Sequence, residues 1–138
     1  MTDDLYPRAL LRLAADAQGA GRLARPDAAG DAHNPACGDW VHVELALAEG
    51  RITALAHQTQ ACVLTQASAA LLAGAAAGQD RAALAGLAEG VRAMLAGDGP
   101  APEGYEVFAG VAGHAGRHVC VLLPFRAVLE ALETAEEG

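Results

Sequence analysis

The stretch from residue 41 to residue 60 constrains the fold more than any other part of the sequence. Over its first half, large apolar residues alternate with polar or small ones: Val41, Val43, Leu45 and Leu47, with His42, Glu44, Ala46 and Ala48 between them. A period of two is typical of a strand with one buried face. Glu49 and Gly50 then form a tight-turn pair, and residues 51–60 return as a second strand. The stretch therefore predicts an antiparallel hairpin.

Apolar residues at helical spacing lie on both sides of this hairpin. A short helical stripe runs over residues 10–17, and a second helix is predicted over residues 62–77. Asp80 is placed to cap a third helix that ends near Gly97. The last helix is expected to start near Pro124, because proline is favoured in a first turn.

The segments between these elements are predicted to be loops. Residues 19–36 are rich in Gly, Ala, Asp and Pro, residues 97–104 read GDGPAPEG, and residues 110–116 look flexible. At 138 residues the chain is expected to be one α+β domain, with a small antiparallel sheet of about three strands packed against several helices. Residues 1–4 and 134–138 are expected to fray.

Charge and hydropathy exclude several classes of function. Nine basic residues, all arginine, face 17 acidic ones, for a net charge of −8. This balance argues against non-specific nucleic-acid binding and favours a protein partner with a basic patch. No apolar run approaches the roughly 20 residues of a membrane span. The first residues are acidic, unlike a signal peptide, so we expect a cytoplasmic protein without a membrane anchor.

The three cysteines fall at predicted junctions between elements. Cys37 lies in the turn NPACGD before the first strand, Cys62 where the second strand meets a helix, and Cys120 just before the C-terminal helix. An odd number of cysteines in a reducing compartment is poor disulfide material. A helix N-terminus favours the thiolate, which binds metals and attacks sulfur. The spacing is far from a C-x-x-C knuckle, so buried structural cysteines are an equally good interpretation on this basis.

Three sequence blocks resemble the IscU/NifU family of iron–sulfur cluster assembly scaffolds. They are NPACGD, ACVLTQASAALLA and RHVCVLLPF, and the resemblance covers about residues 5–133. It implies that Cys37, Asp39, Cys62 and Cys120 converge on one exposed site, which holds iron or a [2Fe–2S] cluster, or zinc when the cluster is absent. It also implies a scaffold, not an enzyme, that takes sulfur from a cysteine desulfurase and passes the cluster to apo-proteins.

The ligand chemistry agrees with this resemblance. Thiolates are soft ligands that suit zinc and iron–sulfur clusters, whereas the Asp39 carboxylate is a harder oxygen ligand. Such a mixed set should release its cluster more easily than four thiolates would. The alternative is that Asp39 only bonds local backbone amides in its turn.

Several positions depart from the family pattern. Thr59 and Ala61 stand where the family usually has glycines, and Val119 stands where it has His or Lys. His118 could replace that residue as a ligand only if the backbone turned it inward, and Arg117 could favour the Cys120 thiolate or lie on the surface.

The long segment between the last two cysteines looks like the SufU branch of the family. Resemblance to this branch implies the alternative function, a zinc-bound protein that accepts sulfur from a cysteine desulfurase. A third interpretation is a divergent relative that binds metal only for stability.

The remaining histidines and the tryptophan are weak evidence for a functional role. His33 and His42 are predicted to face solvent, and His57 and His114 have no partner visible in the sequence. Trp40 could shield the site from water, although packing on its strand is the default.

Overall fold

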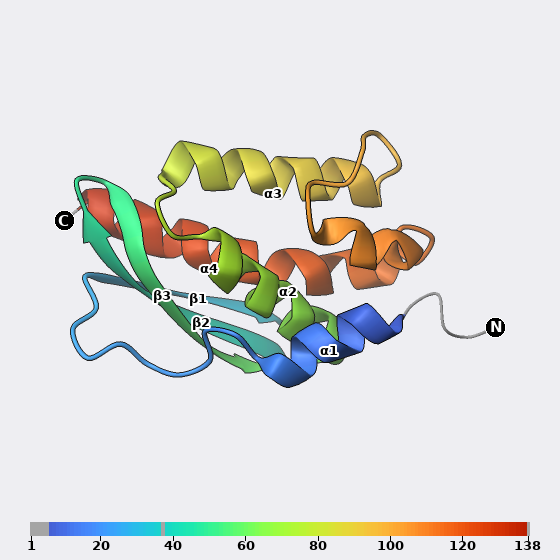
Figure 1. Ribbon diagram of the computed structural model, residues 1–138, viewed down its shortest axis with the longest axis horizontal. Coiled ribbons are helices and arrows are strands. Elements are labelled where there is room, and N and C mark those ends of the chain that lie inside the picture. Colours follow the sequence, from blue (N-terminus) through green and yellow to red (C-terminus); the bar gives the residue numbers. More distant parts are fainter. Residues whose placement is uncertain (1–5, 37, 138) are drawn as a thin grey trace.

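The computed structural model of the protein describes residues 6–36 and 38–137 (Figure 1). Its strands and helices follow in this order along the chain: α1 (Arg8–Asp16), β1 (Ala28–Asn34), β2 (Asp39–Ala48), β3 (Arg51–Gln60), α2 (Val63–Ala75), α3 (Arg81–Leu95), the 3-10 helices η2 (Tyr105–Val111) and η3 (Ala115–Arg117), and α4 (His118–Glu137). None of the helices in these ranges is long and apolar enough to cross a lipid bilayer.

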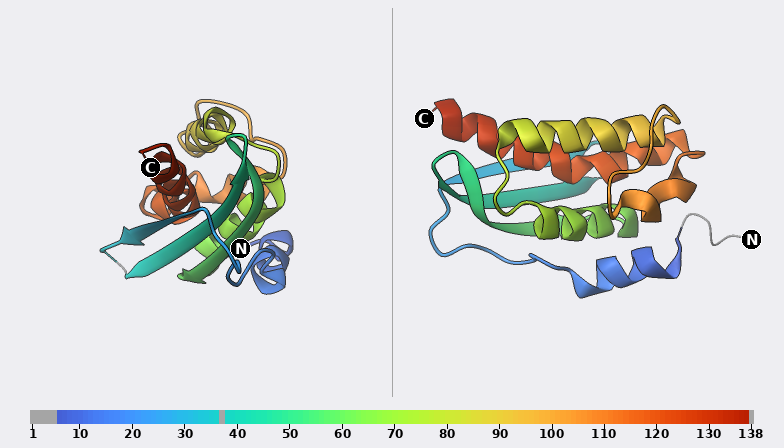
Figure 2. Two further views of the ribbon diagram at one scale, coloured as in Figure 1. Left: turned by 90° about the vertical axis from the view of Figure 1, so that its left-hand side faces the viewer. Right: turned by 45° about the horizontal axis from the view of Figure 1, so that its top comes forward.

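The helices lie against one face of a three-stranded antiparallel sheet with the order β1-β2-β3 (Figures 1 and 2). Helix α4 packs on β1 and β2, and α2 fits between α4 and β3. Helices α3 and α1 form the outer layer, on α4 and α2 respectively. The predicted α+β class is confirmed, and its core lies between the sheet and α2 and α4.

The predicted hairpin is confirmed. Strands β2 and β3 pair from Trp40↔Gln60 to Ala48↔Arg51. Glu49 and Gly50 both have positive φ angles, 56° and 78°. Two consecutive residues with positive φ are typical of a type I′ turn, whose twist matches that of the paired strands.

Strand β1 corrects the prediction that residues 19–36 are mostly loop. Ala28–Asn34 pairs with β2 along its whole length. The segment carries no large apolar residue because α4 lies directly against it. A Cβ atom on Gly30 would overlap the Ala127 carbonyl oxygen and the Ala131 nitrogen of α4. Gly30 is thus a site of close backbone approach, and its glycine does not mark a turn.

Helix α4 corrects the prediction for the C-terminal element. It begins at His118, not near Pro124, so Cys120 lies in its first turn and Pro124 lies inside it. Pro124 offers no N–H to the carbonyl group of Cys120, and the Thr65 hydroxyl of α2 donates to that carbonyl at 2.9 Å. The helix continues to Glu137, beyond the point where fraying was expected to begin.

The other predicted boundaries agree with the structure, except for one loop. Helix α2 follows Cys62, its N-cap, and the Asp80 carboxylate caps α3 by accepting the Ala83 amide at 2.9 Å. Residues 97–104 form a loop as predicted. Within the segment 110–116, which was expected to be flexible, residues 110–111 belong to η2 and residues 115–116 to η3, and η3 leads directly into α4.

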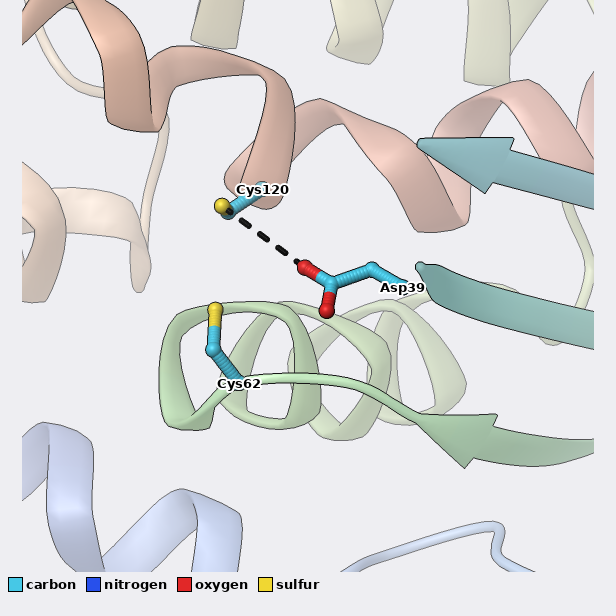
Figure 3. Close-up of side chains that lie close together, drawn as sticks. All are labelled: Asp39, Cys62 and Cys120. Carbon is cyan, nitrogen blue, oxygen red and sulfur yellow. Dashed lines mark hydrogen bonds between the residues drawn. The ribbon is translucent and has the colours of Figure 1, made fainter. Parts of the chain in front are cut away.

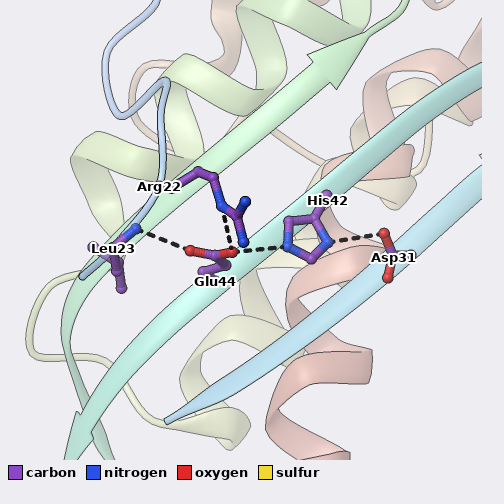
Figure 4. A network of polar contacts seen from close by, with 5 residues as sticks. All are labelled: Arg22, Leu23, Asp31, His42 and Glu44. Atoms are coloured by element: carbon purple, nitrogen blue, oxygen red, sulfur yellow. Dashed lines mark hydrogen bonds and ion pairs between the residues drawn. The ribbon is translucent and has the colours of Figure 1, made fainter. Parts of the chain in front are cut away.

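The outer face of the sheet carries a polar network that the prediction of a solvated His42 missed (Figure 4). The Glu44 side chain is only 4% exposed, because the segment between α1 and β1 crosses it. Its carboxylate accepts the Leu23 amide at 2.9 Å and contacts Arg22 Nε at 3.3 Å. His42 bridges Glu44 Oε2 at 3.1 Å and Asp31 Oδ1 at 2.9 Å.

This network shifts the pKa values of its members. Burial alone would lower the pKa of His42, but the hydrogen bonds and charges of Asp31 and Glu44 outweigh it and raise the pKa above its usual value of 6.5. The hydrogen bond from Leu23 is the main cause that lowers the pKa of Glu44, against the opposing effect of burial. Both shifts mean that the folded protein favours the charged pair.

His57 shows the opposite behaviour on β3. Its ring is buried, its Nε2 donates to the Gln18 carbonyl oxygen at 2.9 Å, and its Nδ1 lies 2.9 Å from Thr59 Oγ1. Burial lowers its pKa, more than the bond to Gln18 raises it. Burial therefore favours the neutral form of His57 in the fold, where the ring has partners that the sequence did not reveal.

The two histidines predict a specific pH dependence. As pH falls from about 7.5 to about 5.5, protonation of His42 adds stability, whereas His57 subtracts it because only the unfolded chain takes up that proton easily. Each effect is at most about 1.4 kcal/mol per pH unit. We expect His42→Gln to lose stability toward pH 5.5 more steeply than the wild type, as measured by urea unfolding. Parallel curves for the two proteins would contradict the assigned network.

Candidate metal centre

Three predicted ligands meet at one end of the sheet. One carboxylate oxygen of Asp39, the Cys62 sulfur and the Cys120 sulfur all lie within 4.8 Å of one another. Figure 3 shows the three side chains pointing toward a common centre from β2, from the N-terminus of α2 and from the first turn of α4. Asp39 and Cys120, which are 81 positions apart in the sequence, thus face each other where the sheet packs on α4.

Asp39 is positioned by the connection between β1 and β2. Asn34 and Asp39 are register partners that close this connection. The Asn34 side chain accepts the Ala36 amide at 3.2 Å, and its carbonyl accepts the Gly38 amide at 2.8 Å. Gly38 has a φ of 76°, a conformation that favours glycine. As the first residue of β2, Asp39 shares the inward face of Val41, so its carboxylate points toward the helices.

Cys62 is positioned by the start of α2. It is the N-cap residue, with φ −67° and ψ 170°, yet its side chain does not cap a backbone amide among the described residues. The thiol instead lies 3.6 Å from Thr65 Oγ1. The Gln66 side chain donates to the Ala61 carbonyl at 2.8 Å and holds the preceding residue in place. Cys62 is half-buried, so the residue remains partly exposed at the start of α2.

Cys120 is the most enclosed of the three. It is 4% exposed, and its thiol makes a long contact of 4.0 Å with Asp39 Oδ2. The alternative interpretation of Asp39 is a turn residue that bonds local amides, and no such bond occurs among the described residues. In this part of the chain the Asp39 carboxylate accepts from the Cys120 thiol, whereas the Asn34 side chain accepts the local amide of Ala36.

These distances suit a small metal site. Two sulfurs that each lie about 2.3 Å from one tetrahedral metal are about 3.8 Å apart. Donor atoms within 4.8 Å of one another need to move by no more than about an ångström to reach that spacing. Two thiols and one carboxylate leave at least one coordination position for a further ligand. The donor set fits zinc or iron–sulfur chemistry better than magnesium or calcium, which prefer oxygen.

Cys37, the fourth predicted ligand, lies outside the described residues. Its neighbours in sequence are Ala36 and Gly38, within the connection that positions Asp39. Its role as a ligand remains a prediction from the sequence.

The other side chains considered as ligands lie elsewhere. His118 Nε2 lies 3.1 Å from the Ala112 carbonyl oxygen, so this nitrogen carries the proton and is not a metal ligand in this arrangement. Arg117 is exposed and forms no ion pair with a described residue. Neither residue belongs to the cluster of donor atoms at Asp39.

Trp40 does not shield the site. It follows Asp39 along β2 and so points to the opposite face of the sheet. There its ring stacks on His42, with 6.0 Å between ring centroids, and tilts against His33 at 6.4 Å. Packing on the strand, the default interpretation, describes it correctly.

Two residues near the centre escaped the sequence analysis. Thr65 and Ser68 are fully buried hydroxyl residues on α2, and both donate to carbonyl groups of α4. The sequence feature that could have identified them is the occurrence of two hydroxyl residues, three positions apart, in a helix made mostly of alanine and leucine.

Most of the chain matches a known protein family. Residues 5–111 match the family described as the NifU-like N-terminal domain. Among curated proteins, none matches this sequence significantly.

Solved structures show the same fold. A NifU-like protein (N-terminal) from Brucella abortus is 35% identical, with a TM-score of 0.91 over 98% of this chain and 96% of that one. A putative iron–sulfur cluster assembly scaffold protein for the SUF system from Fervidobacterium islandicum is 18% identical, with a TM-score of 0.84 over 96% of this chain and 99% of that one. A hypothetical protein that is 25% identical has a TM-score of 0.84, over 95% and 98%.

Proposed function

Because the chain belongs to the family of NifU-like N-terminal domains, we propose that it is a scaffold for iron–sulfur cluster assembly that holds a transient [2Fe–2S] cluster. Cys37, Asp39, Cys62 and Cys120 are the proposed ligands. In this function the protein receives sulfur from a cysteine desulfurase, binds iron, and passes the finished cluster to apo-proteins. Zinc is the proposed occupant of the same residues when no cluster is present.

The observation that carries this proposal is the convergence of two thiols and a carboxylate from three separate elements. A purely structural role for the cysteines would not require the Asp39 carboxylate, 9% exposed, beside the Cys120 thiol. Burial of a carboxylate is unfavourable without a compensating charge or ligand, and a bound metal supplies one. The mixed donor set also suits temporary binding, since the carboxylate is the weaker partner for iron–sulfur chemistry.

The proposed partners follow from the same chemistry. A scaffold takes up sulfur at a thiol that a desulfurase can reach, and Cys62 is half-buried, not enclosed. The net charge of −8 favours a partner with a basic docking surface. Thiols that must stay reduced fit the reducing cytoplasm, which is the proposed location.

A second function is a zinc-dependent sulfur acceptor, in which a thiolate leaves the metal and carries sulfur as a persulfide. The segment between α2 and α4 favours it, because α3, η2 and η3 make this segment long, as the sequence resemblance to the SufU branch implies. The ligands are the same in both functions. What differs is whether iron enters the site and whether a cluster forms.

An assay that measures sulfide release by a partner desulfurase together with cluster formation separates the two functions. The wild-type protein is mixed with a cysteine desulfurase and cysteine, with zinc in one arm and iron in the other. We expect an iron-dependent chromophore to form and then to pass to an apo-ferredoxin. If zinc strongly stimulates sulfide release and no chromophore ever forms with iron, the sulfur-acceptor function replaces the scaffold function.

A further inference from the structure

Helix α2 sends two buried hydroxyl groups to the backbone of α4. Thr65 and Ser68 are both 0% exposed and lie three residues apart, on the same face of α2. Thr65 Oγ1 donates to the Cys120 carbonyl oxygen at 2.9 Å, and Ser68 Oγ donates to the Val121 carbonyl oxygen at 2.6 Å. Buried hydroxyls are unfavourable unless they are paired, so these two bonds are what makes Thr and Ser acceptable here.

Pro124 explains why α4 needs the first of these bonds. In an α-helix the carbonyl of residue i accepts the N–H of residue i+4. The partner of the Cys120 carbonyl would be residue 124, which is proline and has no N–H. Thr65 supplies the missing donor from the neighbouring helix. The backbone of Cys120 is therefore fixed by α2 where an ordinary helix would fix it by itself.

The same hydroxyl also contacts the other cysteine. Thr65 Oγ1 lies 3.6 Å from the Cys62 sulfur. A hydroxyl has one hydrogen, which goes to the Cys120 carbonyl, so toward Cys62 the oxygen presents its lone pairs. One buried side chain thus touches the thiol of one cysteine and the backbone of the other. Ser68 offers no such link, since among the described residues its hydroxyl bonds only the Val121 carbonyl oxygen.

We infer that Thr65 is a positioning residue of the metal centre: together with Pro124, it fixes the first turn of α4 against the start of α2 and so sets the Cys120 sulfur beside Cys62. This inference rests on the proposed function, because it concerns how the same site binds metal. Thr65 is not itself a ligand. Its effect passes through the backbone of Cys120, so a change at Thr65 alters the spacing of the two sulfurs.

The test is metal affinity in a variant that keeps the shape of the side chain. Thr65→Val replaces the hydroxyl with a methyl group of similar size. We expect it to lower zinc affinity, measured by competition with a chelator, by about tenfold, as removal of groups that orient metal ligands commonly does. Cobalt(II) in place of zinc gives a second readout, because its thiolate charge-transfer absorption should weaken when the two sulfurs no longer bind together.

Three further variants isolate the cause. Thr65→Ser keeps the hydroxyl and should stay within about threefold of wild-type affinity. Ser68→Ala removes the neighbouring hydroxyl, which touches no thiol, and should lower the stability of the fold more than the affinity for zinc. Pro124→Ala restores the N–H that α4 lacks, so the double variant T65V/P124A should regain most of the affinity lost in Thr65→Val.

Every outcome decides the inference. Wild-type zinc affinity and cobalt absorption in a folded Thr65→Val would overturn it, as would an equal loss in T65V/P124A. If Thr65→Val does not fold but T65V/P124A does, the dependence of α4 on the hydroxyl is shown directly. If neither folds, the link to Pro124 is wrong. Failure of the wild-type protein to bind zinc, cobalt or iron would instead contradict the proposed function.

Discussion

Cys62→Ser and Cys120→Ser are each expected to abolish cluster formation on this protein. Serine has nearly the same size as cysteine, but its hydroxyl is not a ligand for soft metal centres at neutral pH. The two sulfurs and the Asp39 oxygen lie within 4.8 Å of one another, so loss of either sulfur leaves a single described thiol beside the carboxylate. The measurement is the absorption spectrum and the iron and sulfide content after anaerobic reconstitution.

The matched control for these variants is His118→Gln. His118 begins α4, two residues before Cys120, but its ring bonds the Ala112 carbonyl and lies outside the group of donor atoms. We expect this variant to assemble a cluster like the wild type. Thermal unfolding of each variant shows whether it is folded. A folded Cys62→Ser that still assembles a full cluster would remove Cys62 from the ligand set.

Asp39→Ala is expected to bind a cluster that persists longer and transfers more slowly. The carboxylate is the harder ligand of the set, and its replacement removes the bond that should exchange most readily. Folding stability should change little, because Asn34, not Asp39, holds the turn through the Ala36 amide. Cluster lifetime, transfer rate to an apo-ferredoxin and urea unfolding are measured on the same variant.

A different result for Asp39→Ala would identify a structural role. If Asp39 acted as a cap-like turn residue, its loss would lower stability by about 0.5–2 kcal/mol and leave cluster lifetime unchanged. Asn34→Ala is the matched control for that alternative. It removes the side chain that bonds the Ala36 amide and should lower stability without lengthening the cluster lifetime.

The hairpin and the starts of α2 and α3 could be predicted because their signals are local. Alternation over 41–48 and the Glu49-Gly50 pair define β2, β3 and their turn without reference to the rest of the chain. The capping function of Asp80 likewise depends only on its own first turn. Two of the predicted ligands fall at such local boundaries, Asp39 at the start of β2 and Cys62 at the N-cap of α2.

Strand β1 and the start of α4 could not be predicted because their causes lie in other elements. Gly30 reads as a loop residue, although it is there to admit the backbone of α4. Pro124 reads as a helix start, although a hydroxyl of α2 compensates for it inside the helix. The burial of Cys120 could not be predicted for the same reason, since the helix begins two residues before Cys120 and not after it.

The central claim is that Asp39, Cys62 and Cys120, with Cys37, hold an iron–sulfur cluster for transfer. Anaerobic reconstitution of the wild-type protein with iron and sulfide tests it most directly, with the absorption spectrum and the bound iron and sulfide measured before and after addition of an apo-ferredoxin. We predict two iron and two sulfide ions per cluster, as the [2Fe–2S] assignment requires, and their movement to the ferredoxin. A protein that binds zinc tightly but never acquires bound sulfide or a cluster chromophore would contradict the claim.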